Sequence, residues 1–322
     1  MKQMKRGYIW KAAGAVVVIV IISCSITINS VTQPATVNAG QPLDVTLNAT
    51  IYSQANQTSN LMVAILVPKV WDAATNATMT FTSDITSGAQ PMTVIPAGTP
   101  APKANGLDWP TDLLDNIGHA GNLVNEYEWV AFYSNTGYAI ATNATVNLTV
   151  NIQINVGQAN VLFNMAYVVA ESGDGLSGSS YYGTFFPGSV RVMGSGTLLD
   201  FVHPQLSVIT PSTALDNDIV TIPFNAGLIT NGLSSASQIY LCATGYPHGG
   251  DSITVCQQTT QSRLDSVSTG NWQMDMWPRS FFNLSPTQTL DSMHYFFTDQ
   301  TGTIKVGYAG GATPFSFTFG CQ

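Results

Sequence analysis

The sequence predicts an all-β protein with two tandem antiparallel β-sandwich domains, immunoglobulin-like in kind, that follow a lipoprotein signal peptide. Three observations lead to this prediction. Apolar and polar residues alternate along several segments, which is the period of a half-buried strand. Charged residues make up only 9% of the chain, which does not suit a protein of solvated helices. Glycine, asparagine and aspartate residues that favour turns separate the alternating segments.

The first 23 residues have the pattern of a secretory signal peptide. Lys2, Lys5, Arg6 and Lys11 precede or begin an unbroken apolar run over residues 12–22. A basic start, a short apolar run and small residues at the cleavage point are typical of an exported protein. A membrane-spanning helix needs about 20 apolar residues, so a permanent transmembrane anchor is the weaker interpretation.

The tetrapeptide Ile21-Ile22-Ser23-Cys24 resembles the lipobox of bacterial lipoproteins. In such proteins the cysteine is lipidated and becomes the first residue of the mature chain. The resemblance therefore implies lipid attachment at Cys24, with acyl chains whose buried methylenes contribute about 0.8 kcal/mol each to membrane binding. The alternative is an ordinary signal peptide that is cleaved near an incidental cysteine.

The chain that follows Cys24 is acidic. It contains all 18 Asp and Glu residues but only six of the 10 basic residues. Because nucleic-acid binding requires clusters of Lys and Arg that neutralise phosphates, we expect no nucleic-acid partner. The mature length of about 300 residues exceeds what one hydrophobic core usually serves, which favours two domains.

Strand patterns are clearest in the first half of the chain. Every second residue between Thr145 and Val156 is apolar, which predicts a strand with one buried and one solvated face. Residues 43–51 alternate in the same way. Residues 61–67 are apolar at every position, which suits a central strand covered on both faces. Residues 112–117 favour a short helical turn, and no long helix is expected.

The second half shows the same alternation in shorter segments, at residues 220–224, 304–308 and 315–319. Between the two halves, an expected strand ends at Val192 and is followed by small residues. We place the domain boundary there. The prediction is a signal peptide at residues 1–23, an N-terminal sandwich at residues 24–196 and a C-terminal sandwich at residues 197–322.

Two cysteines of the second half flank a glycine-rich loop. Cys242 and Cys256 would close a short loop if they formed a disulfide, which would add roughly 3 kcal/mol of stability in the chain-entropy model. Cys321 would then be unpaired. Three free thiols are the alternative, because spacing alone does not fix the connectivity.

The sequence contains no recognisable catalytic motif. It has no Ser-centred nucleophile elbow, no phosphate-binding glycine loop and no paired metal-ligand spacing. The four histidines share no motif: His119, His203, His248 and His294. Glu126 and Glu128 lie two apart on an expected strand and would face the same way, which leaves a glycoside hydrolase as one alternative. We expect a non-enzymatic protein that needs no cofactor.

Two acidic clusters offer oxygen ligands of the kind that a structural calcium ion binds. They are Asp216-Asn217-Asp218 and the pair of Glu171 with Asp174. Neither has the full ligand spacing of a calcium loop, so a role in turn formation is the favoured interpretation.

Aromatic residues near turns are the candidates for ligand binding. An exposed flat ring stacks on the apolar face of a sugar while neighbouring polar side chains bind its hydroxyls. Trp272 shares a strand face with two methionines and is predicted to be buried, whereas Trp277 shares one with Gln273 and Asp275 and is predicted to be exposed. Trp109, in a turn-rich segment, is the second exposed candidate. The remaining candidates are Trp71, Trp129, Tyr181 and Tyr182.

Four segments resemble landmarks of a family of uncharacterised bacterial surface lipoproteins with tandem β-sandwich domains. They are residues 66–71 (LVPKVW), 128–130 (EWV), 239–242 (IYLC) and 295–299 (YFFTD). This family is similar in setting to the glycan-binding lipoproteins of starch-utilisation-type systems, whose modules hold polysaccharide near an outer-membrane importer.

The resemblance implies a lipid-anchored, surface-exposed protein of the outer membrane. Its expected partners are a polysaccharide or oligosaccharide, the membrane, and an importer complex. The resemblance supplies no catalytic residues. A structural or adhesive envelope protein that binds a protein partner is the first alternative, and a glycoside hydrolase is the second.

Overall fold

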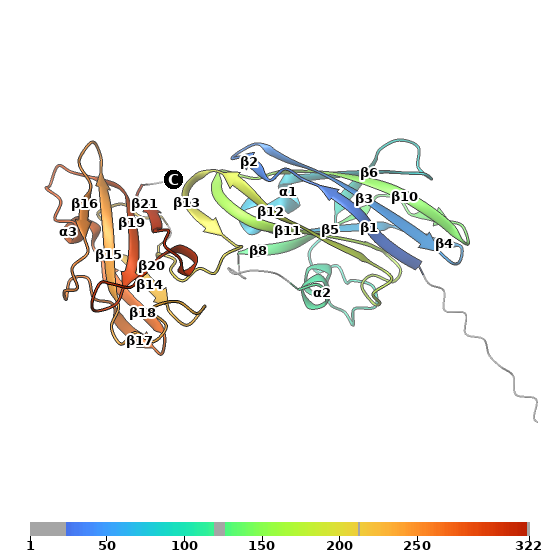
Figure 1. Cartoon of the computed structure of the whole chain (residues 1–322). Helices are drawn as coiled ribbons and strands as arrows, with labels where there is room; N and C mark the ends of the chain where they lie inside the picture. Colours follow the sequence, from blue (N-terminus) through green and yellow to red (C-terminus); the bar gives the residue numbers. More distant parts are fainter. Residues whose placement is uncertain (1–23, 119–125, 212, 321–322) are drawn as a thin grey trace, which may run out of the picture.

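The computed structural model describes residues 24–118, 126–211 and 213–320 (Figure 1). Nearly all of its regular elements are β-strands, and the buried hydrophobic residues form two separate cores, one from Cys24 to Phe201 and one from Leu206 to Phe319. The predicted fold class, all-β with tandem sandwich-like domains, is therefore confirmed. The predicted signal peptide, His119 and Cys321 lie outside the described residues.

The N-terminal domain is dominated by one large sheet with the strand order β1-β3-β10-β6-β7-β8-β5-β11-β12-β2, to which β13 adds by pairing with β11. The strands are β1 (Cys24–Thr32), β2 (Thr36–Asn38), β3 (Pro42–Ser53), β4 (Gln57–Ser59), β5 (Leu61–Pro68), β6 (Ala77–Ser83), β7 (Gln90–Val94), β8 (Tyr127–Ser134), β9 (Tyr138–Ile140), β10 (Ala144–Asn155), β11 (Ala159–Glu171), β12 (Gly183–Met193) and β13 (Ser195–Asp200). The sheet folds over on itself, so that β1 contacts β12 and the two halves enclose the core.

Residues 145–156 form the strand that the alternation predicts. Strand β10 pairs with β3 along its whole length, with Ile152 opposite Val45, and its apolar side chains are buried while its polar ones face solvent. Because neighbouring residues of a strand point to opposite faces, this register places the apolar residues of both strands in the core.

Strand β5 is buried at every position, as its continuous apolar sequence predicts. One face belongs to the core of the sandwich. On the outer face of the sheet, the segment before β8 contains helix α2 (Trp109–Asn116), which packs against β8, the neighbour of β5. The two short helical turns after β5 are η1 (Lys69–Trp71) and α1 (Ala73–Asn76).

Helix α2 begins earlier than the predicted turn at residues 112–117. The side chain of Asp108 accepts a hydrogen bond from the backbone N–H of Thr111, and Pro110 occupies the first turn. An aspartate N-cap and a proline in the first turn are both favourable at a helix start. This cap turns the segment so that Trp109 and Leu113, which lie four residues apart, face the sheet.

The C-terminal domain consists of two facing sheets, with the strand orders β14-β18-β17 and β16-β15-β19-β20, and with β21 paired to β19. Its elements are β14 (Val220–Asn225), β15 (Tyr240–Pro247), β16 (Ile253–Val255), β17 (Asp265–Ser268), β18 (Asn271–Met276), α3 (Pro278–Phe281), β19 (Leu290–Thr298), β20 (Lys305–Val306), η2 (Tyr308–Gly310) and β21 (Phe315–Thr318). The rings of Phe224 and Phe297 stack 4.2 Å apart between the sheets. The predicted disulfide between Cys242 and Cys256 is present.

The boundary between the domains lies later than the prediction after Gly196. Strand β13 pairs with β11, and Phe201 belongs to the N-terminal core, whereas the C-terminal core starts at Leu206. The difference of a few residues arises because β13 pairs in parallel with β11, which local sequence patterns do not show. A second short parallel pairing joins β2 to β12, while the other strand pairs are antiparallel.

The start of β1 and the C-terminal domain lie at opposite ends of the N-terminal domain (Figure 1). At its first residue, β1 pairs with the last residue of β3, next to the small two-stranded sheet of β4 and β9. In the described part of the chain, no helix has both the length and the apolar character needed to cross a membrane.

Candidate functional site

Three of the tryptophans predicted as ligand-binding candidates are core residues of the N-terminal domain. Trp71 and Trp109 are fully buried and Trp129 is 4% exposed. Trp71 packs edge-on against Phe163, and Trp129 donates a hydrogen bond to the carbonyl of Gly118. The prediction that Trp109 is exposed is wrong, because α2 turns its indole onto the sheet.

The side chains of Tyr181 and Tyr182 are half-buried and pack against the N-terminal core. The ammonium group of Lys103 lies 5.9 Å from the centroid of the Tyr181 ring and forms an ion pair with Asp174. The Tyr181 ring thus already has a cation over it, which reduces the surface it offers to a sugar.

Trp277 is the predicted aromatic candidate whose side chain is exposed to solvent. Its side chain is 50% exposed, and Gln273 and Asp275 are exposed beside it, while Met274 and Met276 are buried. The alternation predicted for this segment is therefore confirmed. Trp272 is half-buried and packs against the core.

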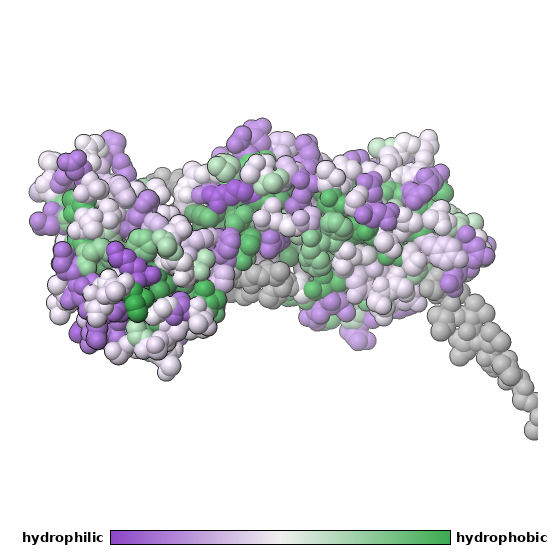
Figure 2. Space-filling model, in the orientation of Figure 1, coloured by the Kyte–Doolittle hydropathy of each residue, from purple (hydrophilic) through white to green (hydrophobic). Residues whose placement is uncertain are grey.

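A small surface surrounds the Trp277 side chain at one end of the β14–β18 pair. Val220 pairs with Met276, so the next residues along each strand, Ile219 and Trp277, lie at the same end of the sheet, where Ile219 is 68% exposed. The hydroxyl of Thr221 donates to the carboxylate of Asp275 at 2.6 Å. We call Ile219, Thr221, Gln273, Asp275 and Trp277 the Trp277 face. Figure 2 shows hydrophobic residues at the surface in this half of the domain, around β18.

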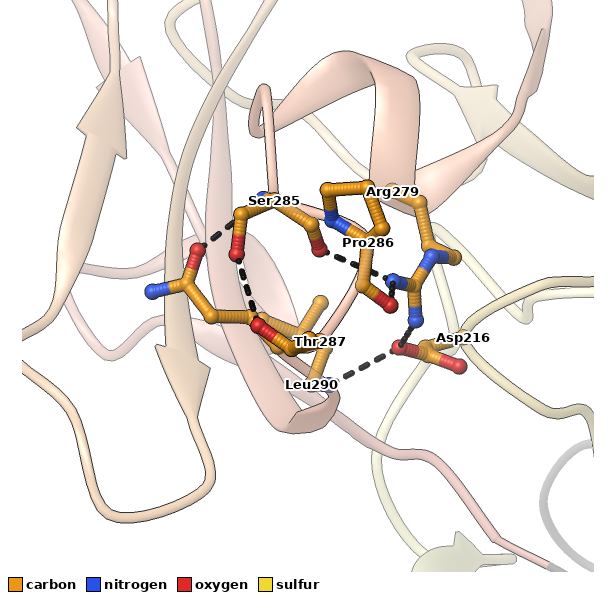
Figure 3. Close-up of polar contacts among 7 residues, drawn as sticks. Asp216, Arg279, Ser285, Pro286, Thr287 and Leu290 are labelled. Atoms are coloured by element: carbon orange, nitrogen blue, oxygen red, sulfur yellow. Dashed lines mark hydrogen bonds and ion pairs between the residues drawn. The ribbon is translucent and has the colours of Figure 1, made fainter.

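An ion pair fixes the two segments that carry the Trp277 face. Arg279, two residues after Trp277, donates from Nη1 to Oδ2 of Asp216 at 3.0 Å, and from Nη2 to the carbonyls of Ser285 and Pro286, also at 3.0 Å (Figure 3). The same Oδ2 accepts from the backbone N–H of Leu290 at 3.0 Å. The side chains of Arg279 and Asp216 are only 17% and 12% exposed, so water competes little for these bonds.

In both acidic clusters considered for calcium, carboxylate oxygens accept hydrogen bonds from backbone N–H groups, as in the turn-forming role that the sequence favoured. Asp218 accepts from the backbone of Leu215, and Glu171 accepts from the backbones of Gly173 and Asp174. Asp216 forms the ion pair with Arg279 described above. No group of three or more His, Cys, Asp or Glu side chains with metal-binding geometry occurs among the described residues.

The two glutamates considered for glycoside hydrolysis do not share a strand. Strand β8 begins at Tyr127, so Glu126 precedes it and Glu128 lies within it. Burial raises the pKa of Glu128, and the charge of Lys69 opposes that shift. The described histidines serve local contacts: His203 with Asp200, His248 with Asp291, and His294 with Tyr246.

Cys24, the predicted lipid attachment residue, is the first residue of β1. Its side chain faces the core and is 1% exposed, and its Sγ accepts a hydrogen bond from Nε2 of Gln57 at 3.4 Å. Burial raises the pKa of the Cys24 thiol.

The domain division agrees with comparisons to protein families. The family described as "Domain of unknown function (DUF4961)" matches residues 26–205, more than half of the chain. The chain belongs to the DUF4961 family. A second description, "Domain of unknown function (DUF8578)", matches residues 207–306. In this DUF4961 protein the two matches meet where the N-terminal core ends and the C-terminal core begins.

No curated protein matches this DUF4961 chain. Three solved structures align with it at low similarity. One is titled "AvmM Catalyzes Macrocyclization in Alchivemycin A Biosynthesis", with 12% identity, a TM-score of 0.30, and coverage of 54% of this chain and 89% of that one. "BspA_C_mut" has 10% identity, a TM-score of 0.24, and coverage of 86% and 95%. The C-terminal domain of the Streptococcus pyogenes antigen I/II-family protein AspA has 8% identity, a TM-score of 0.23, and coverage of 93% and 99%.

Sequence reasoning missed the residues that support the Trp277 face. Asp216 was assigned to a turn or a calcium site, and Arg279 was assigned no role. The available signal was an arginine two residues after a tryptophan predicted to be exposed, because only six basic residues follow Cys24. Its partner could not be read from the sequence, because 63 residues separate Asp216 from Arg279.

Proposed function

We propose that this chain is a non-catalytic lipoprotein of the cell envelope that binds glycan at the cell surface, as an accessory to polysaccharide uptake, through the Trp277 face. The observation that carries the proposal is the half-exposed indole of Trp277 beside Asp275 and Thr221. An indole supplies the flat apolar surface on which a sugar ring stacks, and the carboxylate and hydroxyl supply partners for its hydroxyl groups.

The contacts that hold the segments around Trp277 in place favour a role in glycan binding. The ion pair of Arg279 with Asp216 holds helix α3 and the loop before β14 against one another. A site that is already rigid loses little conformational entropy when a ligand binds, so more of the contact energy appears as affinity. The strongly acidic composition of the chain favours a neutral glycan over a polyanionic one.

A lipid on Cys24 fits this arrangement, because β1 starts at the end of the molecule opposite the C-terminal domain. The anchor would then hold the Trp277 face away from the membrane and toward the medium, where an outer-membrane importer could receive the glycan. Attachment requires Sγ of Cys24, which is buried, to leave its contact with Gln57 and requires the end of β1, where Cys24 pairs with Ser53 of β3, to open.

Replacing Cys24 with alanine is expected to move the protein from the membrane fraction to the soluble fraction, since acyl chains anchor by burial of their methylenes. Membrane fractionation and intact-mass measurement of the purified protein check this result. The matched control is Ser25→Ala, which leaves the cysteine in place. Equal membrane partition of Cys24→Ala and the parent, together with a parent mass that contains no acyl groups, contradicts lipid anchoring.

Trp277→Ala is expected to weaken retardation on a polysaccharide at least tenfold, which corresponds to about 1.4 kcal/mol of binding free energy. Affinity electrophoresis over a panel of neutral polysaccharides measures this change. Trp277→Phe should retain part of the binding, because a smaller ring still stacks. Phe186→Ala is the matched control, since Phe186 is a 58% exposed aromatic residue of the N-terminal domain.

Two outcomes reject glycan binding at this face. The parent protein migrates unchanged on every polysaccharide, or Trp277→Ala and Phe186→Ala bind as well as the parent. Capture of a protein partner in crosslinked membranes, with no dependence on added sugar, would instead favour the structural or adhesive alternative.

A further inference from the structure

The Trp277 face continues along the outer side of a sheet of the C-terminal domain. Strand β18 pairs with β14 along its whole length and with β17 at its other edge (Figure 1). Because neighbouring residues of a strand point to opposite sides, every second residue of each strand faces away from the core. The outward residues are Ile219, Thr221, Pro223 and Asn225 on β14 and its start, and Asn271, Gln273, Asp275 and Trp277 on β18 and its end.

A shallow hollow lies on this outer side, at the end opposite Trp277. It has a volume of about 260 Å³ and is lined by Pro223 and Gln273, which pair directly across the two strands. Val208, from the segment before β14, and Val267, from β17, also line it and are 40% and 61% exposed. We call Val208, Pro223, Val267 and Gln273 the far hollow. Gln273 also belongs to the Trp277 face, so the two surfaces are continuous.

Pro223 gives a physical reason for the far hollow. The segment at residues 206–210 runs beside β14 and accepts backbone hydrogen bonds from Thr221 and Asn225, on either side of Pro223. Pro223 itself has no N–H to donate. The segment is therefore not bonded to β14 next to Val208, which leaves space between them.

The chemistry of the two surfaces suits the parts of a sugar chain. The indole of Trp277 at one end and the ring of Pro223 at the other supply apolar surfaces for sugar rings. The amide of Gln273, between them, can both donate to and accept from hydroxyl groups. A bound chain would also remove the exposed side chains of Val208 and Val267 from water, which is favourable.

The charge on this outer side favours a neutral chain. Of the eight outward residues of the two strands, Asp275 is the one that carries a formal charge, and it is acidic. Among the described residues that line the far hollow, none is charged. An anionic chain would find no cation here to pair with and would be repelled by Asp275.

The outer side is long enough for several sugar units in line. From Asn271 to Trp277 the chain advances about 20 Å, at roughly 3.3 Å per residue. A single sugar on the indole would contact one end only, whereas an extended chain can contact the indole and the far hollow together. Because the second contact is then made within one complex, affinity should rise with chain length.

We propose that the ligand is an extended, neutral oligosaccharide chain that lies along the outer side of β14 and β18, from Trp277 to the far hollow. This inference rests on the proposed glycan binding at the Trp277 face and adds the length and direction of the ligand. It also assigns Val208 and Val267 a role in specificity, since only a long chain reaches them.

The test is titration calorimetry of the full protein with cellohexaose, xylohexaose and mannohexaose, and with the matching disaccharides. The parent is expected to bind one hexasaccharide at least tenfold more tightly than its disaccharide. The double variant Val208→Ser/Val267→Ser should lose this difference and bind the disaccharide as the parent does. Its melting temperature should stay near that of the parent, because both side chains are exposed. Ile304→Ser, at a 41% exposed isoleucine just before β20 in the other sheet, is the matched control.

Affinity electrophoresis of the parent and Trp277→Ala separates this inference from the proposed function. Three calorimetric results overturn the far hollow while Trp277-dependent retardation keeps glycan binding intact. No hexasaccharide gives heat, or each hexasaccharide binds no more tightly than its disaccharide, or the double variant binds the hexasaccharide as the parent does. A parent that migrates unchanged on every polysaccharide overturns both proposals.

Discussion

Replacing Trp109 with alanine is expected to lower the free energy of unfolding of the N-terminal domain by about 4 kcal/mol, as large-to-small changes of buried aromatic residues do. The indole is fully buried, stands edge-on to the Tyr133 ring at 5.8 Å between centroids, and donates from Nε1 to the Tyr133 hydroxyl at 3.1 Å. Its removal leaves a cavity between α2 and the sheet. It also removes the N–H group that donates to the half-buried Tyr133 hydroxyl. Urea unfolding followed by circular dichroism measures the change.

Trp277→Ala is the control for this result, since truncation of an exposed side chain changes stability by roughly 0.5 kcal/mol or less. Trp109→Phe should give an intermediate loss, because the ring contact is kept and the N–H bond is lost. If Trp109→Ala unfolds at the same urea concentration as the parent and no longer binds polysaccharide, then Trp109 is a surface ligand residue and the packing of α2 described above is wrong.

Arg279→Ala should destabilise the C-terminal domain by about 3 kcal/mol, the lower end of the range for breaking a buried ion pair. The change leaves the Asp216 carboxylate with one backbone donor and removes the bonds to the carbonyls of Ser285 and Pro286. Because these bonds hold α3, the variant should also bind polysaccharide more weakly, even though Arg279 is outside the Trp277 face. Denaturant unfolding and affinity electrophoresis measure the two effects.

Arg263→Ala provides the matched control, since Arg263 is an exposed arginine of the same domain. A double-mutant cycle with Asp216→Asn isolates the pair: the double variant should be less destabilised than the sum of the single variants. Additive losses would show that Arg279 and Asp216 act independently. Arg279→Lys should recover only part of the stability, because an ammonium cannot reproduce the planar fork of donors.

The fold class could be predicted because it depends on local periodicity. The alternation at residues 145–156 and the continuous apolar run at residues 61–67 each state which faces of a strand are buried, and β10 and β5 follow them. The exposure of Trp277 could be predicted for the same reason, since β18 is a regular strand up to that residue.

The placement of Trp109 depends on tertiary structure. Its flanking glycine and proline indicate a turn, but the Asp108 cap and the spacing to Leu113 form a helix whose apolar side meets the sheet. The four-residue spacing of Trp109 and Leu113 indicates a helix, but the turn-forming residues near Trp109 favoured a turn in the sequence analysis. The domain boundary could not be placed exactly from the sequence for another reason: it depends on the parallel pairing of β13 with β11.

The position of β1 has a mechanical consequence. The strand begins at Cys24, so nothing flexible separates that residue from the folded sheet. A twelve-residue strand such as β10 extends about 40 Å at roughly 3.3 Å per residue. Under the lipid attachment proposed at Cys24, the C-terminal domain would therefore lie about the length of this sheet away from the membrane surface.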